Sequence, residues 1–172
     1  ISTPGLSTPA PRTKQPVAVG TGGAVASVDL DASRIGRAVL ARGGNAVDAA
    51  VAMAAALGVT EPFSAGIGGG GYLVYRDGRT GRVSTLDGRE TAPATIPTDA
   101  FVDPATGAPY RFKPELVTSG VAVGTPGTLA TWRAALRRWG TDGLRAALDP
   151  ARRLAARGFT VDQTFHDQVV AN

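Results

Sequence analysis

The 172-residue sequence contains no cysteine and a single histidine, His166. The absence of cysteine excludes disulfides, thiolate metal sites and a cysteine nucleophile within this chain, and it leaves the redox compartment open. One histidine argues against a histidine-rich metal site. We therefore expect no metal ion to be bound by these residues.

Lysine is also scarce, because 16 of the 18 basic residues are arginine and only 2 are lysine. With 14 acidic residues, the formal net charge is +4. Seven basic residues lie beyond residue 130, in segments with helical patterns. Asp142 and Asp149 interrupt this basic region and aromatic residues are few, so we interpret it as a solvated helix surface and expect no nucleic-acid partner.

No apolar run reaches the roughly 18 residues that a membrane-spanning helix needs. The longest, "AVDAAVAMAAALGV" at residues 46–59, contains Asp48 and suits a buried helix of a folded domain. Residues 1–16 are rich in serine, threonine and proline, which predicts a flexible leader without a core pattern. We therefore expect no membrane span, and an ordered part that begins at Val17.

The first ordered elements are predicted from short apolar runs and glycine turns. Residues 17–20 and 24–29 have the pattern of two short strands. Asp31 is expected to cap a helix that ends at Gly43–Gly44. Asn45 is expected to start the long apolar helix, with Asp48 three residues later near the positive end of the helix dipole.

The middle of the chain predicts a hairpin, because "YLVYRD" and "RVSTLDGRE" flank the turn sequence "DGRTG" at residues 77–81. Residues 91–115 are rich in proline and are expected to form a surface loop. A third strand is expected at residues 120–124. This mixture of strands and helices indicates a layered α/β or α+β fold.

The C-terminal third is predicted to be helical. Pro126 fits the first turn of one helix, and Pro150 predicts a break before it in the next. Residues 162–172 have a further helical pattern. One face of the first of these helices is expected to carry Leu129, Trp132, Leu136 and Trp139.

The glycine run at residues 66–71 satisfies the pattern G-x-G-x-x-G through Gly66, Gly68 and Gly71. A phosphate-binding loop needs a strand before the glycines and a helix after them, so that the helix N-terminus faces the phosphate. Here a helix precedes the run and a strand follows it. We therefore interpret the glycines as a site where another backbone or a ligand approaches closely, and not as a nucleotide site.

Ser64 in "PFSAGIG" has the general setting of a nucleophile in a tight turn, but Pro62 stands where a nucleophile elbow has glycine. A catalytic pair would also have to recruit His166 from a distant helix. We interpret Ser64 as a turn residue and His166 as a half-buried or surface residue of a helix.

The segment "LDGRETAP" ends the second hairpin strand and contains Asp87, Arg89 and Glu90. The two carboxylates are three residues apart on an extended segment, so they point to opposite faces and do not suit a paired acid/base site. Arg89 stands where an apolar strand meets a loop. Two interpretations remain open at this point: bidentate binding of a ligand carboxylate, or a structural ion pair with a neighbouring acid.

Four stretches together resemble the N-terminal part of the large subunit of γ-glutamyltransferases (γ-glutamyltranspeptidases), from about Val17 to Phe159. They are "GGNAVDAAVAMAAALGVTEPFSAGIGGGGYLVY", "LDGRETAP", "SGVAVGTPGTLATW" and "LDPARRLAARGF". Cephalosporin acylases of the same superfamily share much of this pattern. The resemblance implies an α+β fold, the αββα sandwich of N-terminal-nucleophile hydrolases, of which residues 17–172 supply an incomplete part.

The resemblance further implies a precursor that cuts itself into two subunits. The N-terminal threonine of the small subunit then attacks a γ-glutamyl amide such as that of glutathione, and the acyl group passes to water or to an amino acid or peptide acceptor. This sequence has no stretch that resembles the threonine segment, so no catalytic residue is expected in this chain, and the chain alone is expected to be inactive. No metal or organic cofactor is implied. An extracytoplasmic location is expected from the family and from the composition of residues 1–16.

Two residues match substrate-binding positions of the family. Arg89 matches the arginine that binds the α-carboxylate of the γ-glutamyl group, and Glu90 matches the adjoining acid, which positions Arg89 or lies near the donor amine. An intact "GRETAP" favours a γ-glutamyl donor over the acyl groups of the acylases. The alternatives are an acylase for cephalosporin or glutaryl substrates, and a non-catalytic binding module.

Overall fold

The computed structural model describes residues 17–171, and the predicted leader at residues 1–16 lies outside these residues. The described chain forms six α-helices and a two-stranded antiparallel sheet. The combination of helices with a small antiparallel sheet agrees with the α+β class that was predicted.

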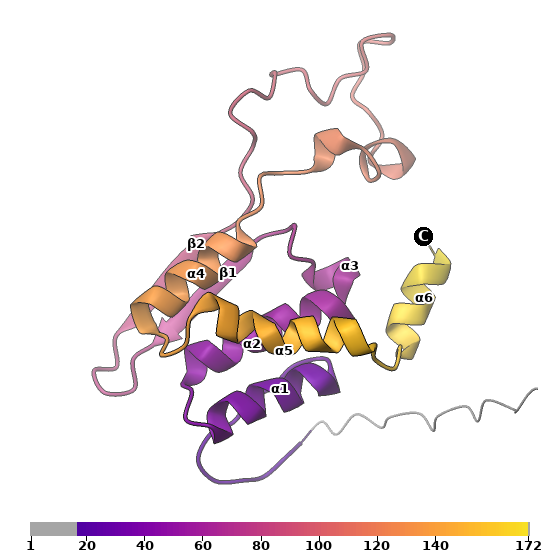
Figure 1. The fold of residues 1–172 in the computed structure, drawn as a ribbon. Coiled ribbons are helices and arrows are strands. Elements are labelled where there is room, and N and C mark those ends of the chain that lie inside the picture. Colours follow the sequence, from indigo (N-terminus) through magenta and orange to yellow (C-terminus); the bar gives the residue numbers. More distant parts are fainter. Residues whose placement is uncertain (1–16, 172) are drawn as a thin grey trace, which may run out of the picture.

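The centre of the molecule is α2 (Ala46–Thr60), which lies between α1 (Leu30–Ala41) and α5 (Leu144–Arg157) (Figure 1). Its alanine-rich surface is buried almost all round, because small side chains let both neighbouring helices approach closely. The predicted start is confirmed: the Asn45 side chain accepts from the backbone of Val47 and Asp48, and Asp48 accepts from the Asn45 N–H at 2.9 Å.

The predicted hairpin is confirmed as β1 (Gly71–Arg76) and β2 (Val83–Gly88). The helix α4 (Thr128–Trp139) covers one face of it, where Tyr75 stacks on Trp139 with ring centroids 4.6 Å apart. The register pairs Gly71 with Gly88. Arg89, the next residue, therefore emerges beside the end of the glycine run.

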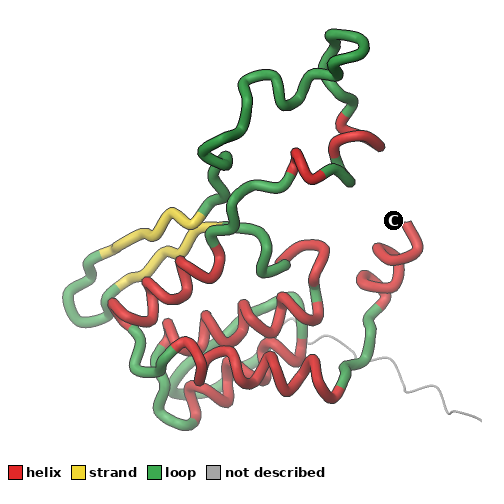
Figure 2. The backbone as a smooth tube through the Cα atoms, turned by 45° about the horizontal axis from the view of Figure 1, so that its top comes forward, coloured by secondary structure: helices red, strands yellow, loops and turns green. Residues whose placement is uncertain are grey.

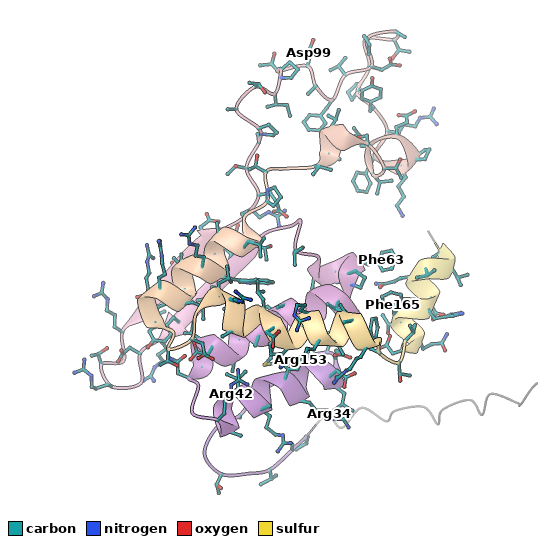
Figure 3. The ribbon with its side chains drawn as sticks, in the orientation of Figure 1. Arg34, Arg42, Phe63, Asp99, Arg153 and Phe165 are labelled. Carbon is teal, nitrogen blue, oxygen red and sulfur yellow. The ribbon has the colours of Figure 1, made fainter. Side chains whose placement is uncertain are left out.

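Residues 91–127 leave the body of the molecule after β2 and return to it at α4 (Figure 2). They are mostly loop, as predicted for residues 91–115, with short helical turns at Phe112–Leu116 and Gly120–Ala122. The two ends of the excursion are joined by an isolated antiparallel bridge between Thr91 and Thr125. Asp99 lies in its outer part (Figure 3).

The chain ends in α6 (Gln163–Ala171), which confirms the predicted final helix. Phe165 on α6 lies edge-on to Phe63 of α3 (Pro62–Ala65) and to Phe159, with ring centroids 5.9 Å apart in both pairs. Figure 3 shows Phe63 and Phe165 pointing toward one another. This aromatic contact is what joins α6 to the short helix that precedes the glycine run.

The predictions for the first ordered residues were partly wrong. Residues 17–20 and 24–29 form no strand, because no neighbouring strand in the described chain offers them hydrogen bonds. Asp29 and not Asp31 caps α1, since its carboxylate accepts from the Ala32 N–H at 2.8 Å. Asp31 lies instead in the first turn, where its charge is favourable near the helix N-terminus.

The strand predicted at residues 120–124 was also wrong, since this segment forms a short helical turn. The helix after it starts at Thr128 with Gly127 as its N-terminal flanking residue, so Pro126 lies before the helix and not in its first turn. Leu129 was predicted to share a helix face with Trp132 and Leu136, and it is 44% exposed whereas those two residues are buried.

No break occurs before Pro150, because α5 runs unbroken from Leu144 to Arg157. Residues on both sides of the proline hold the helix against its neighbours: Ala147, Ala151 and Leu154 are buried in the core. Tertiary packing thus overrides the local preference of proline for a helix end.

Candidate functional site

A cavity of about 840 Å³ lies where the predicted site residues meet. It is bounded by α2 and α3, by the glycine run and the start of β1, and by the N-terminal turn of α4. Arg89 and Glu90 both line it. The structure therefore brings the two predicted substrate-binding residues to one concave surface.

Arg89 follows the last residue of β2, and its backbone N–H donates to the Asp87 carboxylate at 3.0 Å. Its side chain is 67% exposed. The guanidinium Nε lies 3.3 Å from Glu90 Oε2, which is the ion-pair partner of Arg89 in the described chain. An arginine has five N–H donors, so this one contact leaves the outer fork of the guanidinium available to a planar anion.

Glu90 is held more firmly than Arg89, with a side chain that is 27% exposed. Its Oε2 atom is buried and accepts no hydrogen bond from the described residues, although Arg89 Nε is within ion-pair distance. A buried carboxylate oxygen is costly without a donor. Of the two earlier interpretations of Arg89, an ion pair with a neighbouring acid is present, whereas binding of a ligand carboxylate by the exposed guanidinium stays a prediction.

Asp87 and Glu90 do not form a carboxylate pair. Asp87 lies on the exposed face of β2 and accepts from the Arg89 backbone, whereas Glu90 lines the cavity. This arrangement agrees with the alternation of faces expected along an extended segment.

The glycine run lies between α3 and β1, so no helix begins directly after it. This is the order that argued against a phosphate-binding loop. Its backbone is instead bound by a distant segment, because the carbonyl of Gly69 accepts from the N–H of Gly127, the N–H of Thr128 and the hydroxyl of Thr128. The interpretation as a place of close backbone approach agrees with these contacts.

Ser64 and His166 do not form a catalytic pair. Ser64 lies in α3 at the cavity, and its N–H donates to the Glu61 carbonyl at 3.1 Å. His166 is exposed on α6, with its Nδ1 3.1 Å from the adjacent Asp167 carboxylate. Within the described chain neither side chain hydrogen-bonds to the other.

Comparison with known proteins identifies the family that carries this arrangement. The sequence model of the gamma-glutamyltranspeptidase family matches residues 32–172. The chain belongs to this family. The resemblance seen in the four sequence stretches is thereby confirmed.

Three relatives illustrate the match. The glutathione hydrolase proenzyme of Bacillus subtilis (strain 168) is 45% identical over 153 residues, which cover 89% of this chain and 26% of that protein. The crystal structure of Helicobacter pylori gamma-glutamyltranspeptidase superposes with a TM-score of 0.82 at 38% identity, covering 91% of this chain and 44% of that one. The acylase ACY 1 proenzyme of Pseudomonas sp. (strain V22) is 40% identical over 158 residues, covering 90% of this chain and 28% of that protein.

The chain thus spans about a quarter of the length of the curated relatives that it matches. The predicted fold, part of an N-terminal-nucleophile hydrolase, agrees with these γ-glutamyltranspeptidase structures. The single two-stranded sheet of the described residues is what a partial domain of that fold presents.

One wall of the cavity in this γ-glutamyltranspeptidase segment is formed by residues that were not predicted to belong to the site. Thr128, Thr131 and Trp132 line it from α4. Their helical spacing places them on one face, and this signal was present in the sequence. The sequence predicted only that Trp132 shares a helix face with Leu129 and Leu136, and Trp132 is buried, at 7% exposure.

Among residues 17–171, no three acidic, histidine or cysteine side chains are grouped so that they could hold a metal ion. Over the same residues, none of the helices is both long and apolar enough to cross a bilayer.

Proposed function

We propose that this chain is the N-terminal segment of the large subunit of a γ-glutamyltransferase, residues 17–172, preceded by a leader at residues 1–16. The complete enzyme cleaves γ-glutamyl amides such as glutathione and transfers the acyl group to water or to amino acid or peptide acceptors. The chain contributes donor binding, and Arg89 binds the α-carboxylate of the γ-glutamyl group.

One observation carries this proposal: an exposed guanidinium stands at the edge of an 840 Å³ cavity, oriented through its Nε by Glu90. A donor carboxylate is planar and anionic, and the outer N–H groups of arginine match its two oxygens. Glu90 acts on the donor through Arg89. Its carboxylate lines the same cavity, which supports a second role near the α-amino group of the donor.

The covalent chemistry belongs outside this chain. An N-terminal threonine of a small subunit, released by autocatalytic cleavage of the precursor, attacks the amide carbonyl and forms the acyl-enzyme. The small subunit is therefore the partner of this segment, in a heterodimer, and no cofactor is required. The names of the curated proenzyme relatives support the processed precursor. We place the enzyme outside the cytoplasm, in the periplasm, at the cell surface or secreted.

The test uses the complete processed enzyme with Arg89→Ala and Arg89→Lys. Loss of a bidentate charged contact should lower kcat/KM for a γ-glutamyl anilide by about 2–4 kcal/mol, or roughly 30- to 900-fold, for the alanine variant. Lysine keeps the charge without the fork, so its loss should be smaller. The same variants should change the rate on a γ-aminobutyryl anilide, which lacks the carboxylate, by less than about 3-fold.

The matched control is Arg79→Ala, at an exposed arginine in the hairpin turn far from the cavity. It should behave as wild type on both substrates. Equal losses on the two anilides, or no loss on the γ-glutamyl anilide, would refute the role of Arg89. Faster turnover of a glutaryl than of a γ-glutamyl anilide by the unaltered enzyme would support the acylase alternative instead, and a chain with no processed threonine subunit would support the binding module.

A further inference from the structure

Three segments that are far apart in the sequence meet at the backbone of Arg89. They are the glycine run, residues 88–91 at the end of β2, and residues 124–128 at the start of α4. Their junction is made of backbone contacts, and it forms part of the wall of the cavity.

The glycine run and the Arg89 segment touch without intervening side chains. A Cβ added at Gly70 would lie 2.5 Å from the carbonyl oxygen of Gly88 and 2.7 Å from the backbone nitrogen of Glu90. A Cβ added at Gly127 would overlap the same Gly88 carbonyl and lie 3.2 Å from the Arg89 carbonyl oxygen. The backbone on both sides of Arg89 is therefore enclosed by these two glycines.

The N-terminus of α4 is hydrogen-bonded to the glycine run at this junction. No side chain caps the helix, and the Gly69 carbonyl accepts from the N–H groups of Gly127 at 3.1 Å and Thr128 at 3.2 Å. These donors are among the groups that a helix N-terminus leaves unsatisfied. The hydroxyl of Thr128 adds a third and shorter bond to the same carbonyl, at 2.8 Å.

We propose that Thr128 is a positioning residue for donor binding, which acts through Arg89. Its hydroxyl holds the Gly69 carbonyl, the adjoining Gly70 backbone holds residues 88–90, and the guanidinium of Arg89 is thereby presented to the donor carboxylate. This inference rests on the proposed function of Arg89. Loss of the hydroxyl lets the glycine run shift. The guanidinium of Arg89 is then less well positioned, and the donor binds more weakly.

The experiment is a double-mutant cycle in the complete processed enzyme, with Thr128→Val, Arg89→Lys and the double variant. Thr128→Val should raise KM for the γ-glutamyl anilide about 3- to 10-fold, the size expected for one lost neutral hydrogen bond, with kcat within about 2-fold of wild type. In the Arg89→Lys background the same substitution should change KM by less than about 2-fold, because the arginine that it positions is already gone.

Three further variants separate positioning from structural support. Thr128→Ser keeps the hydroxyl and should restore the wild-type KM, whereas Thr128→Ala removes it without a β-branch and should reproduce the effect of valine. Thr118→Val is the matched control, since the Thr118 hydroxyl donates to the Pro114 carbonyl on an exposed loop. That control should leave KM for the donor unchanged.

Additive effects of Thr128→Val and Arg89→Lys would overturn the inference, as would an unchanged KM in both Thr128→Val and Thr128→Ala. Failure of both variants to yield folded enzyme would also overturn it, because the hydroxyl would then serve folding and not donor binding. These results are distinct from failure of the proposed function, which would appear as a normal KM in the single Arg89→Lys variant.

Discussion

At the scale of single residues, Asp48 connects two turns that lie far apart in the sequence. It is 1% exposed, and its carboxylate accepts from the N–H and hydroxyl of Thr141 and the N–H of Asp142, besides that of Asn45. Burial by itself raises the pKa of Asp48, but the Thr141 hydroxyl and the backbone donors outweigh it and hold the pKa below its ordinary value.

The direction of this shift determines how stability depends on pH. Because the pKa is lower in the folded state, Asp48 stabilises the fold fully above its unfolded pKa of about 3.9, and this contribution is lost as the pH falls through the folded value. Asp48→Asn should therefore destabilise the protein at pH 7 by about 2–3 kcal/mol, since an amide cannot accept from all of these donors.

Thermal unfolding of the complete protein between pH 3 and pH 7 measures this effect. The difference in midpoint between wild type and Asp48→Asn should shrink as the pH falls below about 4. Asp99→Asn, at an exposed residue of the loop at residues 91–127, is the control for a general loss of one carboxylate. A difference that stays constant with pH would contradict the role of the ionised Asp48.

At the scale of elements, α1 and α2 pack closely because a glycine lies at their crossing. Gly36 is buried, and a Cβ added there would overlap the sulfur of Met53 and lie 3.2 Å from Val25. Ala38, two residues further along the same helix, is exposed. Helix propensity favours leucine over glycine at position 36 and differs little between alanine and leucine at position 38, whereas packing excludes a larger side chain only at position 36.

The substitutions Gly36→Leu and Ala38→Leu place the same side chain on the two faces of α1. Gly36→Leu should lower the stability of the complete protein by about 1–3 kcal/mol through overpacking, despite the better helix propensity of leucine. Ala38→Leu should stay within about 0.5 kcal/mol of wild type. Chemical denaturation of both variants tests this, and equal stabilities would show that α1 can move away from α2 at little cost.

At the scale of the whole molecule, the hairpin leaves one of its faces uncovered in this chain. Leu73, Tyr75 and Leu86 pack on the core, whereas Tyr72, Val74 and Val83 on the other face are 69%, 69% and 58% exposed. An apolar sheet face is normally buried against another layer. Since the chain spans only about a quarter of its curated relatives, we expect the remainder of the protein to cover it.

Because this face is uncovered, the isolated chain should bind an apolar dye and self-associate more than the complete protein does. Because the proposed nucleophilic threonine lies outside this chain, the isolated chain should also hydrolyse no γ-glutamyl anilide. Val74→Lys should reduce self-association of the isolated chain but impair assembly of the complete enzyme. Val161→Lys, at a 49% exposed valine outside the hairpin, is the control and should change neither. Light scattering and activity assays measure both effects, and a monomeric isolated chain without dye binding would contradict the expectation.

Features that depend on neighbouring residues and on family motifs could be predicted from the amino-acid sequence. The Asn45–Asp48 cap, the hairpin turn and the apolar helix all follow from short stretches of chain, as does the proposal that Arg89 binds the donor. Local signals suffice there because a cap or a tight turn makes its hydrogen bonds within a few residues. The same local reasoning placed strands at residues 17–29 and 120–124, where no partner strand in the described chain pairs with them.

The contacts that build the site join residues far apart in the sequence, so they are seen only in the folded molecule. The Gly69 carbonyl and the Thr128 hydroxyl are 59 residues apart, and Asp48 and Thr141 are 93 residues apart. The contacts that enclose Arg89 are made between backbones, and although the glycine run predicted a close approach, the sequence did not show which segments it would meet. For the same reason α5 continues through Pro150: burial of Ala147, Ala151 and Leu154 is a property of the packed molecule and not of the helix alone.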